Sequence, residues 1–192
     1  RNSTTAGLVV YNYGKKVGLI VADGKHEWAV DDEGDVVIGD LVGNPYDDRF
    51  VVKLTSPHLI QQHILTYKNA LNLPNDIVDG LWIKFMRQAP IQGKGVHQDV
   101  GKQVQRNLYE DNGWRKRWGE EGVPPPTPIE PVQQAVGDMY LSVAQVWNRD
   151  IDVKRLAGRE VRPLEDVAAE LWVIEELNRI GQLPWTWKEV KK

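Results

Sequence analysis

The chain has 192 residues, a formal net charge of −3, 41% hydrophobic residues and 27% charged residues, a balance typical of ordinary folded proteins rather than disordered or fibrous ones. It contains no cysteine, which excludes disulfide frameworks, thiolate nucleophiles, iron–sulfur clusters and cysteine-ligated zinc. Charges or prolines interrupt every apolar run well before the roughly 18 residues that a membrane span needs. We therefore expect a soluble, non-membrane-spanning protein of unknown location.

The first part of the chain, residues 1–56, has the pattern of short strands. Apolar residues alternate with polar ones over residues 7–54, with turn-forming residues between the runs. The segments 17–21 and 26–30 flank Asp23-Gly24, a dipeptide that favours a two-residue hairpin turn. We predict a β-rich unit here, folded as an antiparallel β meander or a small barrel.

A helical pattern replaces the alternation from Pro57 onward. Ser56 suits the position before a helix, and proline suits its first turn. The apolar spacing then predicts a helical hairpin, a glycine-rich loop over residues 89–101 and a shorter helix over residues 100–112. Together these elements form a helical middle region, residues 57–122.

Four prolines within residues 124–128 mark the best candidate for a boundary, because they favour an extended segment. Thr127 and Glu130 have the spacing of a helix-capping pair, and a regular apolar stripe over residues 164–180 predicts the last helix. Residues 123–192 are therefore expected to form a proline connector and a C-terminal helical pair. The whole chain is predicted to belong to the α+β class.

Motifs for catalysis, metals and phosphates are incomplete. Residues 93–95 lack the upstream glycine and the following Ser or Thr of a phosphate-binding loop. The acidic cluster over residues 31–35 lacks the ligand alternation of a calcium loop and is interpreted as a hairpin turn around Gly34. The three serines have no Gly-x-Ser-x-Gly elbow, and the four histidines lack zinc-site spacing, so we interpret the histidines as polar residues at the surface and at helix ends. We assign no catalytic residue, no metal and no cofactor.

The most distinctive stretch is basic and aromatic. Between residues 94 and 118 there are six basic and three acidic side chains, together with three aromatic ones. Such a stretch can contact phosphates and stack on bases, although the chain as a whole is acidic. The candidate residues for contact with nucleic acid or a protein partner are Trp114, Arg115, Lys116, Arg117 and Trp118.

Tryptophan is abundant, with eight residues in the chain. Trp185 and Trp187 follow the last predicted helix, where a core has little room for both. Because protein interfaces are enriched in tryptophan and arginine, these two residues are candidates for partner contact, and the alternative is that they cover the edge of their own domain.

Three hypotheses for function follow. The leading one is a non-catalytic interaction or assembly protein, such as a structural subunit of a virion or another multi-protein complex, whose partners are other protein subunits or further copies of itself. The second is nucleic-acid contact through residues 94–118. The third is an enzyme whose site is assembled from remote residues, for which His97 and Asp99 in the glycine-rich loop are the first candidates.

Overall fold

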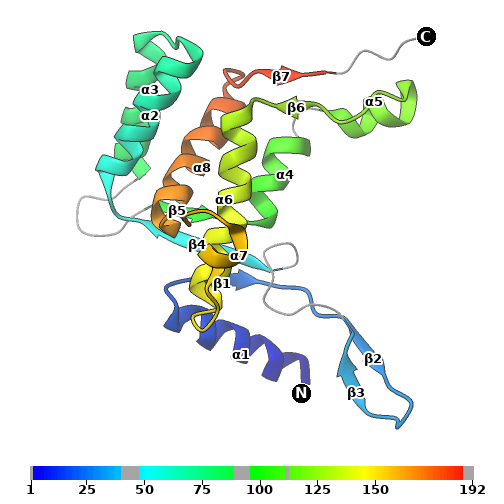
Figure 1. Ribbon diagram of the computed structural model, residues 1–192. Helices are drawn as coiled ribbons and strands as arrows, with labels where there is room; N and C mark the ends of the chain where they lie inside the picture. Colours follow the sequence, from blue (N-terminus) through cyan, green and yellow to red (C-terminus); the bar gives the residue numbers. More distant parts are fainter. Residues whose placement is uncertain (1, 40–47, 89–95, 111–112, 188–192) are drawn as a thin grey trace.

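The computed structural model describes residues 2–39, 48–88, 96–110 and 113–187 (Figure 1). Over these residues the chain is α+β, with strands near the N-terminus preceding a helical region, as predicted. The helices are α1 (Asn2–Lys16), α2 (Pro57–Leu71), α3 (Asn75–Gln88), α4 (Lys102–Glu110), α5 (Trp114–Glu121), α6 (Glu130–Trp147), α7 (Val153–Ala157) and α8 (Leu164–Arg179). The strands are β1 (Ile20–Asp23), β2 (Trp28–Val30), β3 (Val36–Ile38), β4 (Arg49–Leu54), β5 (Val96–Asp99), β6 (Thr127–Pro128) and β7 (Trp185–Thr186).

Helix α8 lies at the centre of the molecule. Nine of its sixteen residues are buried, because its apolar stripe is covered from several sides. It packs against α2, α4 and α6 and against strands β4 and β5. Figure 1 shows α8 between the α2–α3 pair and α6. The stripe over residues 164–180 is thus the main wall of the core.

The largest sheet has three antiparallel strands in the order β1-β4-β5. In β4, alternate residues Phe50, Val52 and Leu54 are buried, which is the period of a strand with one covered face. The same buried cluster contains Val10 of α1, Tyr67 of α2, and residues of α4, α6 and α8. The three predicted ranges of the chain therefore contribute to one hydrophobic core.

The N-terminal part differs from the predicted meander in two respects. Residues 7–16 belong to helix α1 rather than to a strand. The predicted hairpin around Asp23-Gly24 is also wrong, because β1 pairs with the distant β4, whereas β2 pairs with β3. The expected turn at Gly34 is confirmed: its φ of 85° lies in the left-handed region that glycine adopts most readily.

The turn between β2 and β3 is closed by Asp31. Its carboxylate accepts hydrogen bonds from the backbone amides of Glu33 and Asp35, at 3.2 and 2.8 Å. The Gly34 amide donates to the Asp31 carbonyl at 3.0 Å. The acidic cluster therefore forms a hairpin turn, as the sequence indicated.

The proline connector also differs from its prediction. Thr127 does not cap the following helix, because it lies in β6, and Ile129 occupies the cap position of α6. Strand β6 pairs with β7, with Pro128 opposite Trp185. The connector thus anchors the C-terminal strand.

No helix among the described residues is both long and apolar enough to cross a membrane.

Candidate functional site

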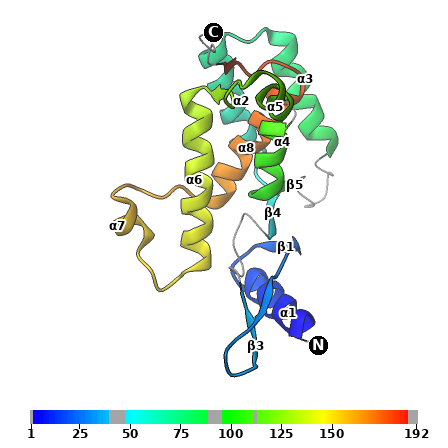
Figure 2. The same ribbon diagram turned by 90° about the vertical axis from the view of Figure 1, so that its right-hand side faces the viewer.

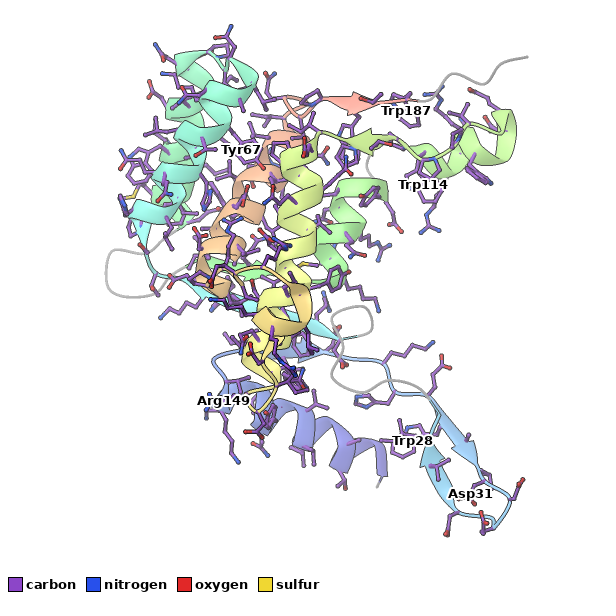
Figure 3. All side chains as sticks on the ribbon, viewed as in Figure 1. Trp28, Asp31, Tyr67, Trp114, Arg149 and Trp187 are labelled. Carbon is purple, nitrogen blue, oxygen red and sulfur yellow. The ribbon has the colours of Figure 1, made fainter. Side chains whose placement is uncertain are left out.

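The two predicted contact segments meet at one end of the molecule. Trp114 begins α5 and Trp187 follows β7, and Figure 3 shows both at the end formed by α5 and the C-terminal strand. A cleft of about 410 Å³ lies between α4 and α5. Its lining residues, which define the α4–α5 cleft, are Lys102, Gln105, Arg106, Tyr109, Glu110, Trp114 and Arg115.

The α4–α5 cleft combines cations with aromatic walls. Lys102, Arg106 and Arg115 outnumber Glu110, the one acidic residue among its described lining. Glu110 accepts from Arg106 Nε at 2.6 Å and lies 3.4 Å from Arg115 Nη2. The Arg115 side chain is 70% exposed, so its charge faces solvent. The cleft therefore has a positive rim.

Trp114 is one of the aromatic side chains that line this cleft. Its indole Nε1 is buried and has no hydrogen-bond partner among the described residues. A buried N–H without an acceptor costs free energy, typically about 1–3 kcal/mol. The guanidinium of Arg115 lies 5.2 Å from the centroid of the same indole ring. Trp114 therefore forms an aromatic wall of the cleft next to the Arg115 cation.

Trp185 and Trp187 each contact residues of their own chain, and their contacts differ. Trp185 donates from Nε1 to Asn178 Oδ1 at 2.9 Å and meets Tyr109 edge-to-face at 5.5 Å, so it covers the edge of its own fold. The guanidinium of Arg117 lies 4.3 Å from the centroid of the Trp187 ring. Trp118 is 52% exposed. Of the tryptophans predicted for partner contact, Trp118 is thus the most accessible.

A second surface is the β2–β3 hairpin. Trp28 pairs with Ile38 and Val30 pairs with Val36, so these four side chains share one face, which we call the hairpin face. Val30, Val36 and Ile38 are 68%, 54% and 41% exposed. Figure 1 shows the hairpin projecting from the rest of the fold. Sequence reasoning identified the strands here but not that their apolar face is open.

A third feature concerns the proposed enzyme site. His97 lines a cleft of about 240 Å³ that also contains Gln98, Asn107 and Glu175, whereas Asp99 does not line it. Asp99 accepts from the Gly101 amide at 3.0 Å; burial raises its pKa, and the amides of Gly101 and Gln103 act in the opposite direction. The two candidates therefore have different surroundings. Residues 93–95 lie outside the described residues.

Glu175 was missed by sequence reasoning. Burial raises its pKa to about 7, although Gln98 and Asn107 donate hydrogen bonds to its carboxylate, the latter at 2.8 Å. The neighbouring charges of Asp99 and Glu176 act in the same direction as burial. A carboxyl that titrates near neutral pH can exchange protons, but no nucleophile or metal cluster accompanies it among the described residues.

A buried ionic network links α8 to α6 and α2. Arg162 contacts three carboxylates: Nη1 lies 2.5 Å from Glu170 and 3.2 Å from Asp138, and Nη2 lies 2.7 Å from Asp166. Asp138 also pairs with Arg159, at 2.5 Å. Burial opposes the ionisation of Asp166, but hydrogen bonds from Arg162 and His63 lower its pKa below the usual value.

Two side chains of α2 complete this network. Tyr67 donates to Glu170 at 3.1 Å, and burial raises the pKa of the Tyr67 hydroxyl. His63 is 6% exposed and its Nε2 lies 2.8 Å from Asp166 Oδ1, so the interpretation of His63 as a polar residue at the surface is wrong. Glu170 follows Val167 by three positions and precedes Ile174 by four, which places a charge inside the apolar stripe. That spacing was the signal for the network.

No family model matches the sequence, and no significant match was found among curated proteins or solved structures. The function must therefore be argued from the geometry of these surfaces.

Proposed function

We propose that the chain is a non-catalytic interaction protein, a structural subunit that assembles with other protein subunits into a larger particle such as a virion or another multi-protein complex. The observation that carries this proposal is the hairpin face. An isolated two-stranded hairpin is only marginally stable in water, and this one presents valine and isoleucine to solvent. Such a surface gains stability when a partner covers it.

Other features support assembly more than catalysis. The Trp-rich and Arg-rich surface around α5 has the composition that interfaces enrich. The ionic network of Arg162 is satisfied within the fold, and its carboxylates are engaged by arginine, tyrosine or histidine. It therefore stabilises the scaffold rather than offering reactive groups.

The alternative of nucleic-acid contact draws support from the positive rim of the α4–α5 cleft. The chain as a whole carries a formal net charge of −3, however, which is unlike the strongly basic footprint of a dedicated nucleic-acid binder. Protein contact is therefore favoured over contact with a polyanion.

The test is the association state of the purified chain, measured by sedimentation velocity over a range of concentrations. We expect concentration-dependent assembly that Ile38→Thr weakens by about threefold in Kd, because full burial of an isoleucine contributes about 1.5–3 kcal/mol and only the exposed 41% of Ile38 remains for a partner to cover. Ile20→Thr is the matched control, because Ile20 also lies in a strand and is 42% exposed, against 41% for Ile38.

A chain that remains monomeric at every concentration, and that retains no added protein subunit, would contradict the proposal. Equal weakening by Ile38→Thr and Ile20→Thr would remove the hairpin face as its basis.

A further inference from the structure

The β2–β3 hairpin carries charge as well as apolar surface. Its turn contains Asp31, Asp32, Glu33 and Asp35, and the last three are exposed. Asp31 is occupied in closing the turn, so the acidity offered to a partner comes from the other three carboxylates. The hairpin thus ends in an acidic tip next to an apolar face, and we use acidic tip for Asp32, Glu33 and Asp35.

The α4–α5 cleft has the complementary character. Tyr109 and Trp114 provide aromatic walls, while Lys102, Arg106 and Arg115 provide a positive rim. Lys116 does not line the cleft, but it follows Arg115 in the chain and is exposed in the first turn of α5, which contains no acidic residue. The N-terminal end of a helix favours negative charge, so a carboxylate is favoured here by the helix as well as by the side chains.

The Trp114 side chain gives the cleft an aromatic wall that suits the apolar hairpin face, whereas its indole N–H is buried and is not accessible to a partner. The charge and the apolar surface of the cleft therefore both match the hairpin.

The hairpin and the cleft of one molecule lie far apart. In Figure 3 Trp28 and Asp31 mark one end of the structure and Trp114 the other, and Figure 2 likewise separates β3 from α5. A hairpin therefore reaches the cleft of a different copy rather than its own. Contacts between two different surfaces repeat head to tail and generate a ring or a filament.

We propose that the acidic tip and hairpin face of one copy dock into the α4–α5 cleft of a second copy, and that this contact builds a head-to-tail assembly. This proposal rests on the proposed function, and it identifies the partner as a second copy of the same chain. The contact joins opposite charges, so salt weakens it.

The experiment uses two variants of the full chain. The hairpin variant is Val30→Thr/Val36→Thr, which removes a cross-strand apolar pair but keeps β-branched residues. The cleft variant is Arg115→Glu/Lys116→Glu, whose glutamates fall in the first turn of α5, where they favour the helix. Its control is Lys154→Glu/Arg155→Glu, which reverses another adjacent pair of basic residues, in the short helix α7, where Lys154 pairs with Glu160.

We expect each of the first two variants alone to lose self-association by at least tenfold in sedimentation velocity. An equimolar mixture regains association, because the intact hairpin of the cleft variant meets the intact cleft of the hairpin variant. The α7 control associates as the wild type does. Circular dichroism confirms that each variant is folded.

Three results would overturn this docking. If the cleft variant assembles like the wild type, the hairpin binds another surface, and the proposed function survives without this partner. If the mixture stays monomeric while the wild type assembles, the contact is not head to tail. If the cleft variant loses a salt-sensitive gel shift with a single-stranded oligonucleotide and keeps assembly, the cleft binds nucleic acid. A wild-type chain that never associates contradicts the proposed function itself.

Discussion

Arg117 lies over the indole ring of Trp187, with 4.3 Å between its guanidinium carbon and the ring centroid. This contact joins two segments that the sequence presents as separate candidates for partner binding. It couples α5 to the C-terminal strand, which β6 also holds through Pro128 and Trp185. The end of the molecule that carries the α4–α5 cleft is therefore built from both segments.

Replacing Arg117 with alanine should loosen this end of the molecule. We expect a loss of about 0.5–1 kcal/mol in the free energy of unfolding, which is typical of an exposed cation–π contact. In a ¹⁵N-labelled sample the Trp187 indole resonance should shift. Glu121→Gln is the control, because it removes the ion pair of Arg117 with Glu121 and leaves the stack. Identical spectra for Arg117→Ala and wild type would contradict the contact.

The buried network predicts a large effect at Arg162. Arg162→Met leaves the carboxylates of Asp138, Asp166 and Glu170 without their shared cation, and breaking a buried pair costs about 3–5 kcal/mol. Urea unfolding measures this loss. Arg159→Met is the matched control, because Arg159 is 42% exposed and forms an ion pair with Asp138, whereas Arg162 contacts three carboxylates, so its loss should be smaller. Equal losses would show that the network does not depend on Arg162.

The helices were predictable from the sequence where local signals agree. Helix α2 begins at Pro57 and α4 spans Lys102–Glu110, close to the expected positions, because proline and glycine punctuation coincide with apolar spacing. The stripe of α8 was predictable for the same reason. The α+β class follows from these elements and from the short strands.

Other features of the structure could not be predicted from local sequence patterns. Residues 7–16 contain β-branched valines and few turn signals within the run, so apolar content alone did not distinguish helix from strand. The pairing of β1 with β4 and the stack of Arg117 on Trp187 are long-range contacts that no local pattern encodes. The α4–α5 cleft could be predicted as a set of residue types but not as a shape.

Glu175 gives a pH-dependent prediction. Its folded pKa of about 7 exceeds its ordinary value of 4.5, so the folded state binds more protons between these pH values. Stability from this group is highest below about pH 4.5 and falls as the pH rises to about 7. Glu175→Gln removes this dependence.

The measurement for Glu175 is urea unfolding of both proteins at several pH values from 4 to 8. As the pH rises from 4 to 8, the free energy of unfolding of the variant should increase relative to that of the wild type by on the order of 1–3 kcal/mol. A carbon-13 titration of the Glu175 carboxyl should show a midpoint near 7. Parallel stability profiles for the two proteins would contradict the burial of this charge.

The glycine at position 24 can be explained either by backbone conformation or by lack of space for a side chain. The sequence predicted a two-residue hairpin turn at Asp23-Gly24, a turn type that commonly needs positive φ, but Gly24 is not among the described glycines with positive φ. A side chain at this position would instead collide with the carboxylate of Asp48, which is 1% exposed. Gly24→Ala should therefore destabilise the fold by about 1–3 kcal/mol, because the buried Asp48 must move.

Gly80→Ala is the matched control for Gly24. Gly80 lies within α3, and an added Cβ meets nothing within 4 Å, so alanine should stabilise the helix by about 0.5–1 kcal/mol. Thermal unfolding of the two variants should thus move in opposite directions from the wild type. If Gly24→Ala were neutral, the close approach of Asp48 would be wrong. If Gly24→Asn were tolerated and Gly24→Ala were not, a requirement for left-handed backbone would account for the glycine instead, because asparagine adopts that conformation more readily than alanine.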